Sequence, residues 1–198
     1  MSTTTVPETD APPPPKRSKV KTALLTVFAV VLASVGVVLA MASTKPEKFR
    51  VERSIVVKAP PEKITPHLND LKKWPTWSPW EKVDPDMKRE YSGAESGVGA
   101  KYAWDGDSNI GAGQIEIKES TSHFMAFSLD FIRPMACKNS ADFTLTPADD
   151  GTKVTWAMYG DNTFMGKVIQ VFCSMDDMCG PQFDEGLKNL KGLAEATN

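Results

Sequence analysis

An uninterrupted apolar run near the N-terminus constrains this chain more than any other feature. Thr22–Thr44 reads TALLTVFAVVLASVGVVLAMAST and contains no charged side chain. As a helix it would be about 35 Å long at about 1.5 Å per residue, enough to cross a hydrocarbon core of roughly 30 Å. A buried helix of a soluble domain would carry a polar stripe, whereas this run offers only Thr, Ser and Gly. We therefore predict one transmembrane helix.

Two details of this segment leave alternatives open. Ala40-Met41-Ala42 matches a signal-peptidase site, so a cleaved signal peptide is the competing interpretation. The apolar run is longer than the apolar part of a usual signal peptide, and this favours a retained anchor. Lys and Arg flank both ends, and the tighter cluster at 16–21 favours a cytoplasmic N-terminus. We thus expect a single-pass protein of the cell membrane with an extracytoplasmic domain.

The composition divides the rest of the chain into a tail and one domain. Residues 1–21 are rich in proline, threonine and basic residues, and they predict a disordered basic tail. Residues 1–45 carry a net charge of +3, and residues 46–198 carry −5. A mildly acidic domain argues against a nucleic-acid partner, and the basic tail suits anionic lipid headgroups. Residues 46–198 are numerous enough to form one domain with its own core.

The hydrophobic pattern of this domain predicts strands followed by a long helix. Alternating segments predict strands at 49–58, 88–91, 100–104, 113–119, 124–132, 139–146 and 153–159. Apolar residues at helical spacing from Phe164 to Ala194 predict a C-terminal helix with a kink or break at Gly180-Pro181. The segment WPTWSPW at 74–80 predicts a tight loop with buried rings. The expected fold class is α+β, a curved antiparallel sheet of about six or seven strands around the long helix.

In this order, the segments resemble the SRPBCC (START-like, helix-grip) superfamily. Within it, they are similar to the polyketide cyclase/dehydrase and lipid transport group. The resemblance is carried by KAPPE at 58–62, WPTWSPWE at 74–81, VTWAM at 154–158 and FMGK at 164–167, and it spans nearly all of 49–195. It implies a helix-grip domain that holds a hydrophobic small molecule or lipid between sheet and helix. It does not fix the chemistry, because this fold carries several functions.

Large apolar side chains on the strands and the helix are the candidate lining of that cavity. Methionine is frequent among them, and its side chain packs adaptably against varied ligands. The predicted lining is Trp104, Met125, Phe127, Phe131, Trp156, Met158, Phe172 and Met175. In the alternative, an accessory or interaction domain, the same side chains fill a core without a ligand.

Catalytic and metal-binding signals are weak throughout. The chain has no G-x-S-x-G, H-E-x-x-H, P-loop or dinucleotide motif, and its three cysteines fit neither a zinc site nor a disulfide framework. We therefore expect no catalytic residue, metal or cofactor, and the sequence favours a binding protein. The alternative is a cyclase- or hydrolase-type enzyme that uses a Tyr/Asp/Arg set in the cavity.

A few polar residues are candidates for a role at the cavity. Asp130 and Arg133 are candidates for an ion pair at its mouth, and Tyr91, Tyr102 or Tyr159 for a hydrogen bond to the ligand. The acidic pairs at 176–177 and 184–185 are expected on a solvated face of the C-terminal helix.

Overall fold

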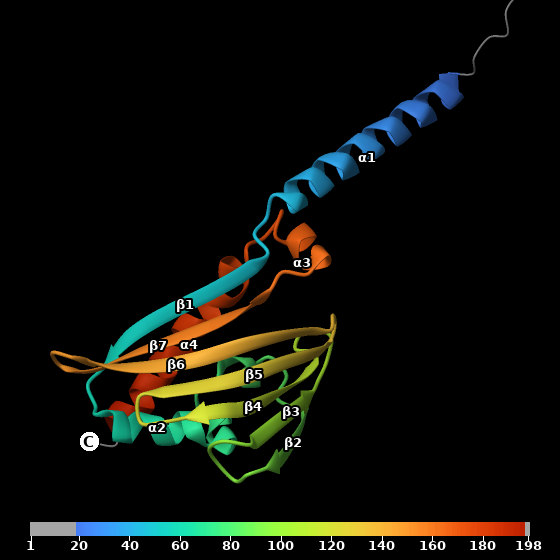
Figure 1. The fold of residues 1–198 in the computed structure, drawn as a ribbon. Coiled ribbons are helices and arrows are strands. Elements are labelled where there is room, and N and C mark those ends of the chain that lie inside the picture. Colours follow the sequence, from blue (N-terminus) through green and yellow to red (C-terminus); the bar gives the residue numbers. More distant parts are fainter. Residues whose placement is uncertain (1–18, 197–198) are drawn as a thin grey trace, which may run out of the picture. The chain divides into compact units, whose positions relative to one another are not determined.

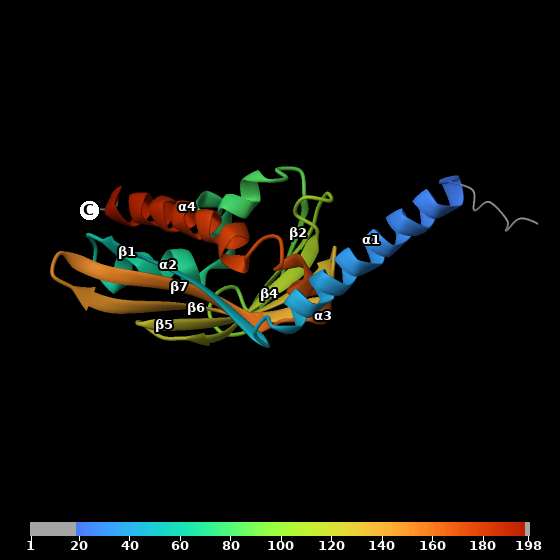
Figure 2. The same cartoon turned by 90° about the horizontal axis from the view of Figure 1, so that it is seen from above.

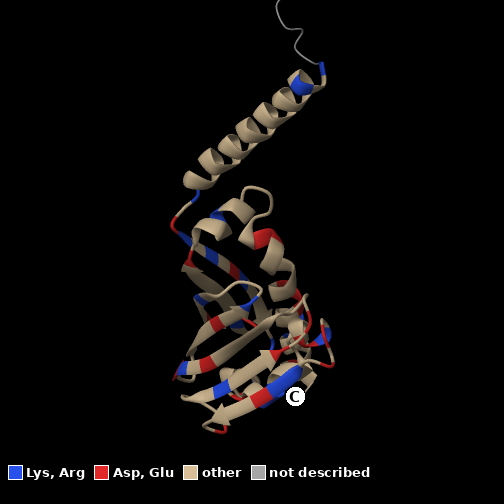
Figure 3. Ribbon diagram, turned by 90° about the vertical axis from the view of Figure 1, so that its right-hand side faces the viewer, with Lys and Arg blue, Asp and Glu red and all other residues tan. Residues whose placement is uncertain are grey.

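The computed structural model describes residues 19–196, which belong to two compact units that divide near residue 40. Helix α1 (Lys19–Ser43) is long and apolar enough to cross a membrane. Its charged residues lie in the first turn (Figure 3). The described part of the helix starts at Lys19 and therefore also includes Lys19–Lys21, ahead of the predicted Thr22. The rest of the predicted disordered tail lies outside the described residues.

The second unit is built on one seven-stranded antiparallel sheet (Figure 1). Its strands are β1 (Lys48–Val57), β2 (Lys88–Gly93), β3 (Ala100–Asp105), β4 (Ala112–Ser120), β5 (Phe124–Arg133), β6 (Cys137–Ala148) and β7 (Gly151–Asp161). The spatial order is β1-β7-β6-β5-β4-β3-β2, so the first strand closes on the last one. Two register shifts in β4 mark bulges, which bend a strand and help to curve a sheet.

Helices cover one face of this sheet (Figure 2). Helix α2 (Pro61–Asn69) is followed by two short 3-10 helices, η1 (Leu71–Thr76) and η2 (Pro79–Lys82), which contain the tryptophan-rich segment. Helix α3 (Phe164–Ile169) follows β7, and the longer α4 (Met175–Ala196) packs mainly on β1. This arrangement confirms the predicted α+β helix-grip fold.

The C-terminal helix breaks at a different place from the one predicted. The interruption falls at residues 170–174, between α3 and α4, and α4 continues through Pro181. The cause is a capping box: the Asp177 amide donates to Ser174 Oγ (3.0 Å), and the Ser174 amide donates to Asp177 Oδ2 (3.2 Å). Beyond Pro181, Phe183 and Leu187 are both 1% exposed, so tertiary packing holds the helix together there.

Candidate functional site

The helix-covered face of the sheet divides into two halves at the level of Arg53. This β1 residue lies opposite Trp156 of β7 and binds the first turn of α4. Farther along β1, Lys191 Nζ of α4 donates to Val56 O, at 2.7 Å. We call the part of this face on which α4 lies the proximal half; it runs from Arg53 to Val57 along β1 and from Trp156 to Thr152 along β7. The part that extends past the start of α4 is the distal half; it runs from Val51 to Phe49 along β1 and from Met158 to Gly160 along β7.

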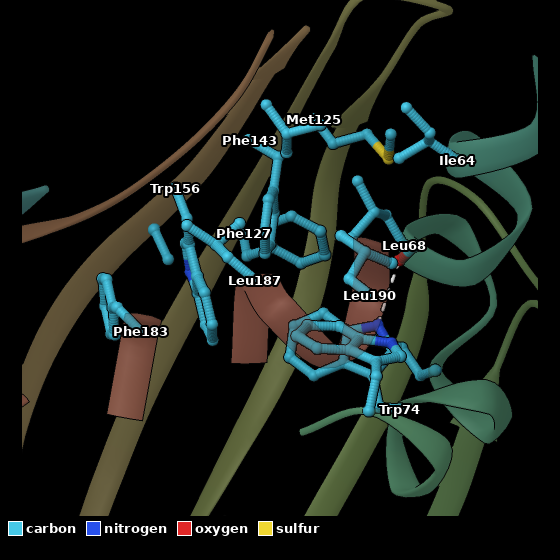
Figure 4. Packing of buried hydrophobic residues seen from close by; sticks show 14 of the residues in the cluster. Ile64, Leu68, Trp74, Met125, Phe127, Phe143, Trp156, Phe183, Leu187 and Leu190 are labelled. Carbon is cyan, nitrogen blue, oxygen red and sulfur yellow. Dashed lines mark hydrogen bonds between the residues drawn. The ribbon is translucent and has the colours of Figure 1, made fainter. Parts of the chain in front are cut away.

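The proximal half is filled by stacked aromatic rings (Figure 4). The Trp156 ring lies between those of Phe143 and Phe183, with centroid distances of 4.9 and 4.2 Å and interplanar angles of 24° and 5°. Trp77 meets Trp156 edge-on at 5.5 Å, and its indole N–H donates to His67 O. Aromatic pairs of such geometry contribute about 0.5–1.5 kcal/mol each beyond area burial. This half therefore works as a core.

The same core includes two more of the predicted lining residues, Met125 in the proximal half and Phe127 on the Met158 row of the distal half. Met125 is 0% exposed and Phe127 is 2% exposed. The Phe127 ring lies 5.4 Å from that of Trp74, whose indole N–H donates to Leu68 O at 3.1 Å. The tryptophan loop therefore occupies the space over these strands with its hydrogen bonds satisfied.

The distal half gathers three other predicted residues, Trp104, Phe131 and Met158. The Trp104 ring meets Phe131 edge-on at 5.8 Å, and Phe131 is only half-buried. Trp104 can lie across β4 because residue 113 is glycine: a Cβ there would stand 2.5 Å from the indole. Phe131 is therefore the least covered member of this apolar group, whereas Trp104 and Met158 are only 9% and 6% exposed.

Asn139 is a buried polar residue in this distal half. It is 8% exposed, and it alternates in phase with Ala141 and Phe143, so it faces the same side as the aromatic core. Its Nδ2 makes one weak contact to Cys137 Sγ at 3.9 Å, while its Oδ1 has no hydrogen-bond partner. Gly160 leaves room for this amide, since a side chain there would collide with Oδ1. An unpaired buried acceptor costs about 1–3 kcal/mol, so this oxygen is a natural place for a ligand donor.

The sequence interpretation missed Asn139 although a signal was present. The predicted strand began at residue 139, and its alternation put Asn139 on the face of Ala141 and Phe143. A polar side chain on an otherwise apolar, buried face is unusual and normally needs a hydrogen-bond partner.

A buried polar cluster stands on the same row of the sheet, on β3. The Tyr102 hydroxyl donates to Glu81 Oε1 at 2.6 Å, and Arg89 Nε donates to Glu81 Oε2 at 2.8 Å. Burial, and then the hydrogen bond to Glu81, raise the pKa of Tyr102 far above its ordinary value. Arg89 Nη1 also donates to the carbonyl oxygens of Pro85 and Met87. These groups satisfy one another, so they brace the tryptophan loop against β2 and β3.

The other polar candidates take different partners from those expected. Arg133 pairs with Asp105 and not with Asp130. Tyr159 lies under the Arg50 guanidinium, 5.2 Å from its ring centroid. Asp142 joins Arg50 and Tyr159, so a Tyr/Asp/Arg group does form, but on the face of the sheet opposite the aromatic core and not in the predicted cavity.

The acidic pairs of α4 at 176–177 and 184–185 are exposed, as predicted, and two of these four residues also bind Arg53. Asp176 accepts two hydrogen bonds from Arg53, at 2.7 and 2.8 Å, and Asp184 accepts a third at 3.3 Å. Gly180 makes room for the guanidinium, which a side chain there would displace. This Arg53 clasp fixes the first turns of α4 to β1.

Two predicted lining residues lie at or before the start of α4. Met175 is its first residue and is half-buried, whereas Phe172 is 76% exposed in the connection after α3. Phe172 therefore lies outside the helix on which the sequence placed it, because the capping box at Ser174 starts α4 at Met175, three residues later. In this structure it does not share an enclosed space with Trp156.

Hollows elsewhere on the domain do not include the predicted lining. One, of about 350 Å³, is bordered by α2 and by Ser96 and Ser122. Another, of about 90 Å³, lies beside Leu71 and Tyr91. Within residues 19–196, no group of three or more His, Cys, Asp or Glu side chains is arranged to hold a metal ion.

The family model described as polyketide cyclase / dehydrase and lipid transport matches residues 48–195. The chain belongs to this family. The match covers the whole sheet and α4, and it confirms the resemblance seen in the sequence. No functionally curated protein is significantly similar to the chain.

Solved structures share the fold of this family member at low sequence identity. A protein from Mesorhizobium loti is 19% identical, with a TM-score of 0.53 over 76% of this chain and 99% of its own. A protein of unknown function from Staphylococcus aureus is 11% identical, with a TM-score of 0.54 over 76% and 96%. The di-domain ARO/CYC StfQ from the steffimycin biosynthetic pathway is 10% identical, with a TM-score of 0.55 over 76% and 51%. At such identities the likeness concerns the fold alone.

Proposed function

We propose that this protein is a membrane-anchored binding domain for a hydrophobic small molecule or lipid. The ligand is held on the distal half of the helix-covered face, which is the concave face of the sheet. The observation that carries the proposal is the unpaired Oδ1 of buried Asn139 beside Leu129, its neighbour across β5 and β6. A binding site of this kind is mostly apolar, with a few placed polar groups that orient the ligand. Trp104, Phe131 and Met158 supply the apolar part.

The ligand that fits has an apolar body and at least one hydrogen-bond donor. Asn139 on β6 and Tyr102 on β3 stand on one row of the sheet, with Leu129 and Ile115 between them. Three strand spacings of about 4.8 Å separate the two polar groups by roughly 14 Å. A hydroxyl, amide or protonated carboxyl of the ligand would donate to Asn139, while its hydrocarbon part lies over Ile115 and Leu129.

The packed side chains of the proximal half block the other end of the site. Because Trp156 is stacked on both sides and Phe183 is 1% exposed, a ligand has no room beneath the middle of α4. The ligand therefore enters from the end of the sheet next to α3. The family description, which includes lipid transport, supports this class of ligand.

In this proposal α1 is a retained anchor in the cell membrane, with a cytoplasmic N-terminus and an extracytoplasmic domain. Its length and apolar composition support the anchor, and the tight basic cluster before it supports the orientation. Alkaline carbonate should leave the chain in the membrane pellet, and protease added outside spheroplasts should digest the domain. Release by carbonate, or a first residue after Ala42 in the mature protein, would refute the anchor.

Native mass spectrometry of the full chain, released from mild detergent, tests ligand binding. We expect mass adducts that extraction identifies as apolar molecules with a hydrogen-bond donor. Asn139→Leu, which keeps the branching of the side chain but removes the acceptor, should lose most of the adduct. Ser140→Ala is the matched control, because the adjacent side chain lies on the opposite face of β6. An adduct-free wild-type protein that also fails to bind added fatty acids would contradict the proposal.

A further inference from the structure

Helix α3 buries its charged residue and exposes its apolar ones, the reverse of a surface helix in a soluble domain. Its one charged residue, Lys167, is 8% exposed and pairs with Glu47. Its apolar residues face outward instead: Phe164 is 61% exposed, Met165 53% and Ile169 40%, and Phe172 in the connection is 76% exposed. We call these four residues the α3 patch. Large apolar side chains gathered in this way mark an interaction surface.

The patch is tied to the residues that follow α1. Asn162, just before α3, donates from its amide to Glu47 O at 2.7 Å and from Nδ2 to Pro46 O at 2.8 Å. Gln170, just after α3, donates to Asn162 Oδ1 at 2.5 Å. Both ends of α3 are thus connected to the start of the domain.

The length of the chain limits how far this patch can be from a membrane that α1 crosses. Pro46 follows the last residue of α1, Ser43, by three residues. Three residues span at most about 10 Å, and the headgroup zone of a bilayer is roughly 5–8 Å deep on each side. This tether is short enough for the patch to reach the level where amphipathic helices insert Phe and similar side chains.

The opposite end of the sheet lacks such side chains. From Thr44 to Ala196, the exposed phenylalanines and methionines all fall within 164–178. At the α2 end, which lies away from α3 in both views (Figures 1 and 2), the turn at 94–99 exposes only Val98, at 59%. The exposed Phe and Met side chains are therefore gathered at the end where the chain leaves for α1, whereas Val56, Val83 and Val98 are exposed singly elsewhere.

We propose that the α3 patch docks into the headgroup layer of the same bilayer that α1 crosses, so that the distal half of the concave face opens toward lipid. This proposal rests on the anchor of the proposed function. The partner is the lipid surface itself, and docking gives an apolar ligand a path that does not pass through water. Lys45 and Lys48, at the same level, suit anionic headgroups.

The exposed Cys173, next to Phe172, offers a place for a reporter. The full chain with Cys137→Ala and Cys179→Ala is labelled at Cys173 with an environment-sensitive fluorophore and reconstituted into vesicles that contain anionic lipid. We expect quenching by lipids that carry a spin label near the headgroup, and protection from aqueous iodide. A second protein, labelled at Val98→Cys with Cys173→Ala, is the matched control, and it should show the opposite behaviour.

The variant with Phe164→Ser, Met165→Ser and Phe172→Ser should lose the lipid quenching and keep its thermal unfolding midpoint, because these side chains are exposed. Equal iodide access at Cys173 and Val98→Cys in protein that resists carbonate would refute docking and leave the anchor standing. Protection of Cys173 that persists in detergent together with cross-linked dimers would also refute it, because a second copy would then cover the patch. Release of the chain by carbonate would refute the anchor and docking together.

Discussion

In the proximal half of the concave face, Trp156 is stacked between Phe143 and Phe183, and the tryptophan loop fills what space remains. In the distal half, Trp104 meets the half-buried Phe131, and the Asn139 amide oxygen beside Gly160 has no partner. Both halves are built from aromatic and methionine side chains on the same strands. The difference between them lies in the cover: α4 and the loop close the first, and α4 begins only at the edge of the second.

This difference shows why residue type alone does not separate a core from a binding surface. Met125 and Met158 are both methionines on the helix-covered face, but Met125 lies in the proximal half and Met158 in the distal half. Asn139 Oδ1 is the unpaired buried acceptor on the strands of the distal half, whereas the unpaired Gln182 Oε1 and His67 Nδ1 belong to the covering helices α4 and α2.

The largest effect should come from breaking the proximal stack. Phe183→Ala removes a ring at 4.2 Å from Trp156, and such truncations of buried Phe cost about 3–5 kcal/mol. Phe131→Ala, on the half-buried side, should cost clearly less. Denaturant unfolding of the full chain in detergent, followed by near-UV circular dichroism, measures both. Equal losses would mean that the distal half is packed as tightly as the proximal half.

The next effect concerns the polar brace beside the distal half. Glu81→Ala leaves the Arg89 guanidinium and the Tyr102 hydroxyl without their buried acceptor, and breaking a buried pair costs about 3 kcal/mol. Glu81→Gln should cost less, because its amide oxygen still accepts one hydrogen bond. Unfolding measurements on both variants provide the check. An Ala variant within about 0.5 kcal/mol of wild type would show that the cluster does not brace the loop.

Asn139→Leu should change stability in the opposite direction. Without ligand, the substitution removes an unpaired buried carbonyl and should raise the free energy of unfolding by about 1 kcal/mol. Ligand binding should weaken at the same time. Thermal unfolding of delipidated protein, with Ser140→Ala alongside, measures the first part. A clear loss of stability in Asn139→Leu would mean that Oδ1 serves the fold and not a ligand.

The smallest effect should come from the Arg53 clasp, and it should depend on pH. The hydrogen bond from Arg53 holds the pKa of Asp176 below its ordinary value of 3.8. A carboxyl with a lowered folded-state pKa stabilises the fold above its unfolded pKa and loses that contribution as pH falls through the folded value. We expect a small drop of the unfolding midpoint below about pH 4, which Asp176→Asn should reduce. An identical acid profile in both proteins would exclude this role.

Most of the fold could be predicted from the sequence. Alternation along 139–146 and 153–159 and the proline-rich tryptophan segment predicted strands and a buried loop, because periodicity of 2 and the geometry of proline are local properties. The sequence prediction placed the kink or break at Gly180-Pro181 and missed the one before α4, because it did not consider the capping box formed by Ser174 and Asp177.

The site was less accessible to sequence reasoning. The sequence pattern cannot separate Met125 and Trp156 from Trp104 and Met158, because the position of α4 along the sheet decides in which half each residue lies. The partners of Tyr102 and Arg53 lie 21 and 123 residues away in the chain, and only the three-dimensional fold brings them together.

Photolabelling tests the contrast between the two halves most directly. The full chain in nanodiscs is irradiated with a fatty acid that carries a diazirine, with excess unlabelled fatty acid as competitor, and the labelled peptides are mapped. We expect competitor-sensitive label on the distal residues Leu129, Phe131 and Met158, strongly reduced in Asn139→Leu. Saturable label on Met125 or Trp156, or label confined to α1, would contradict the account.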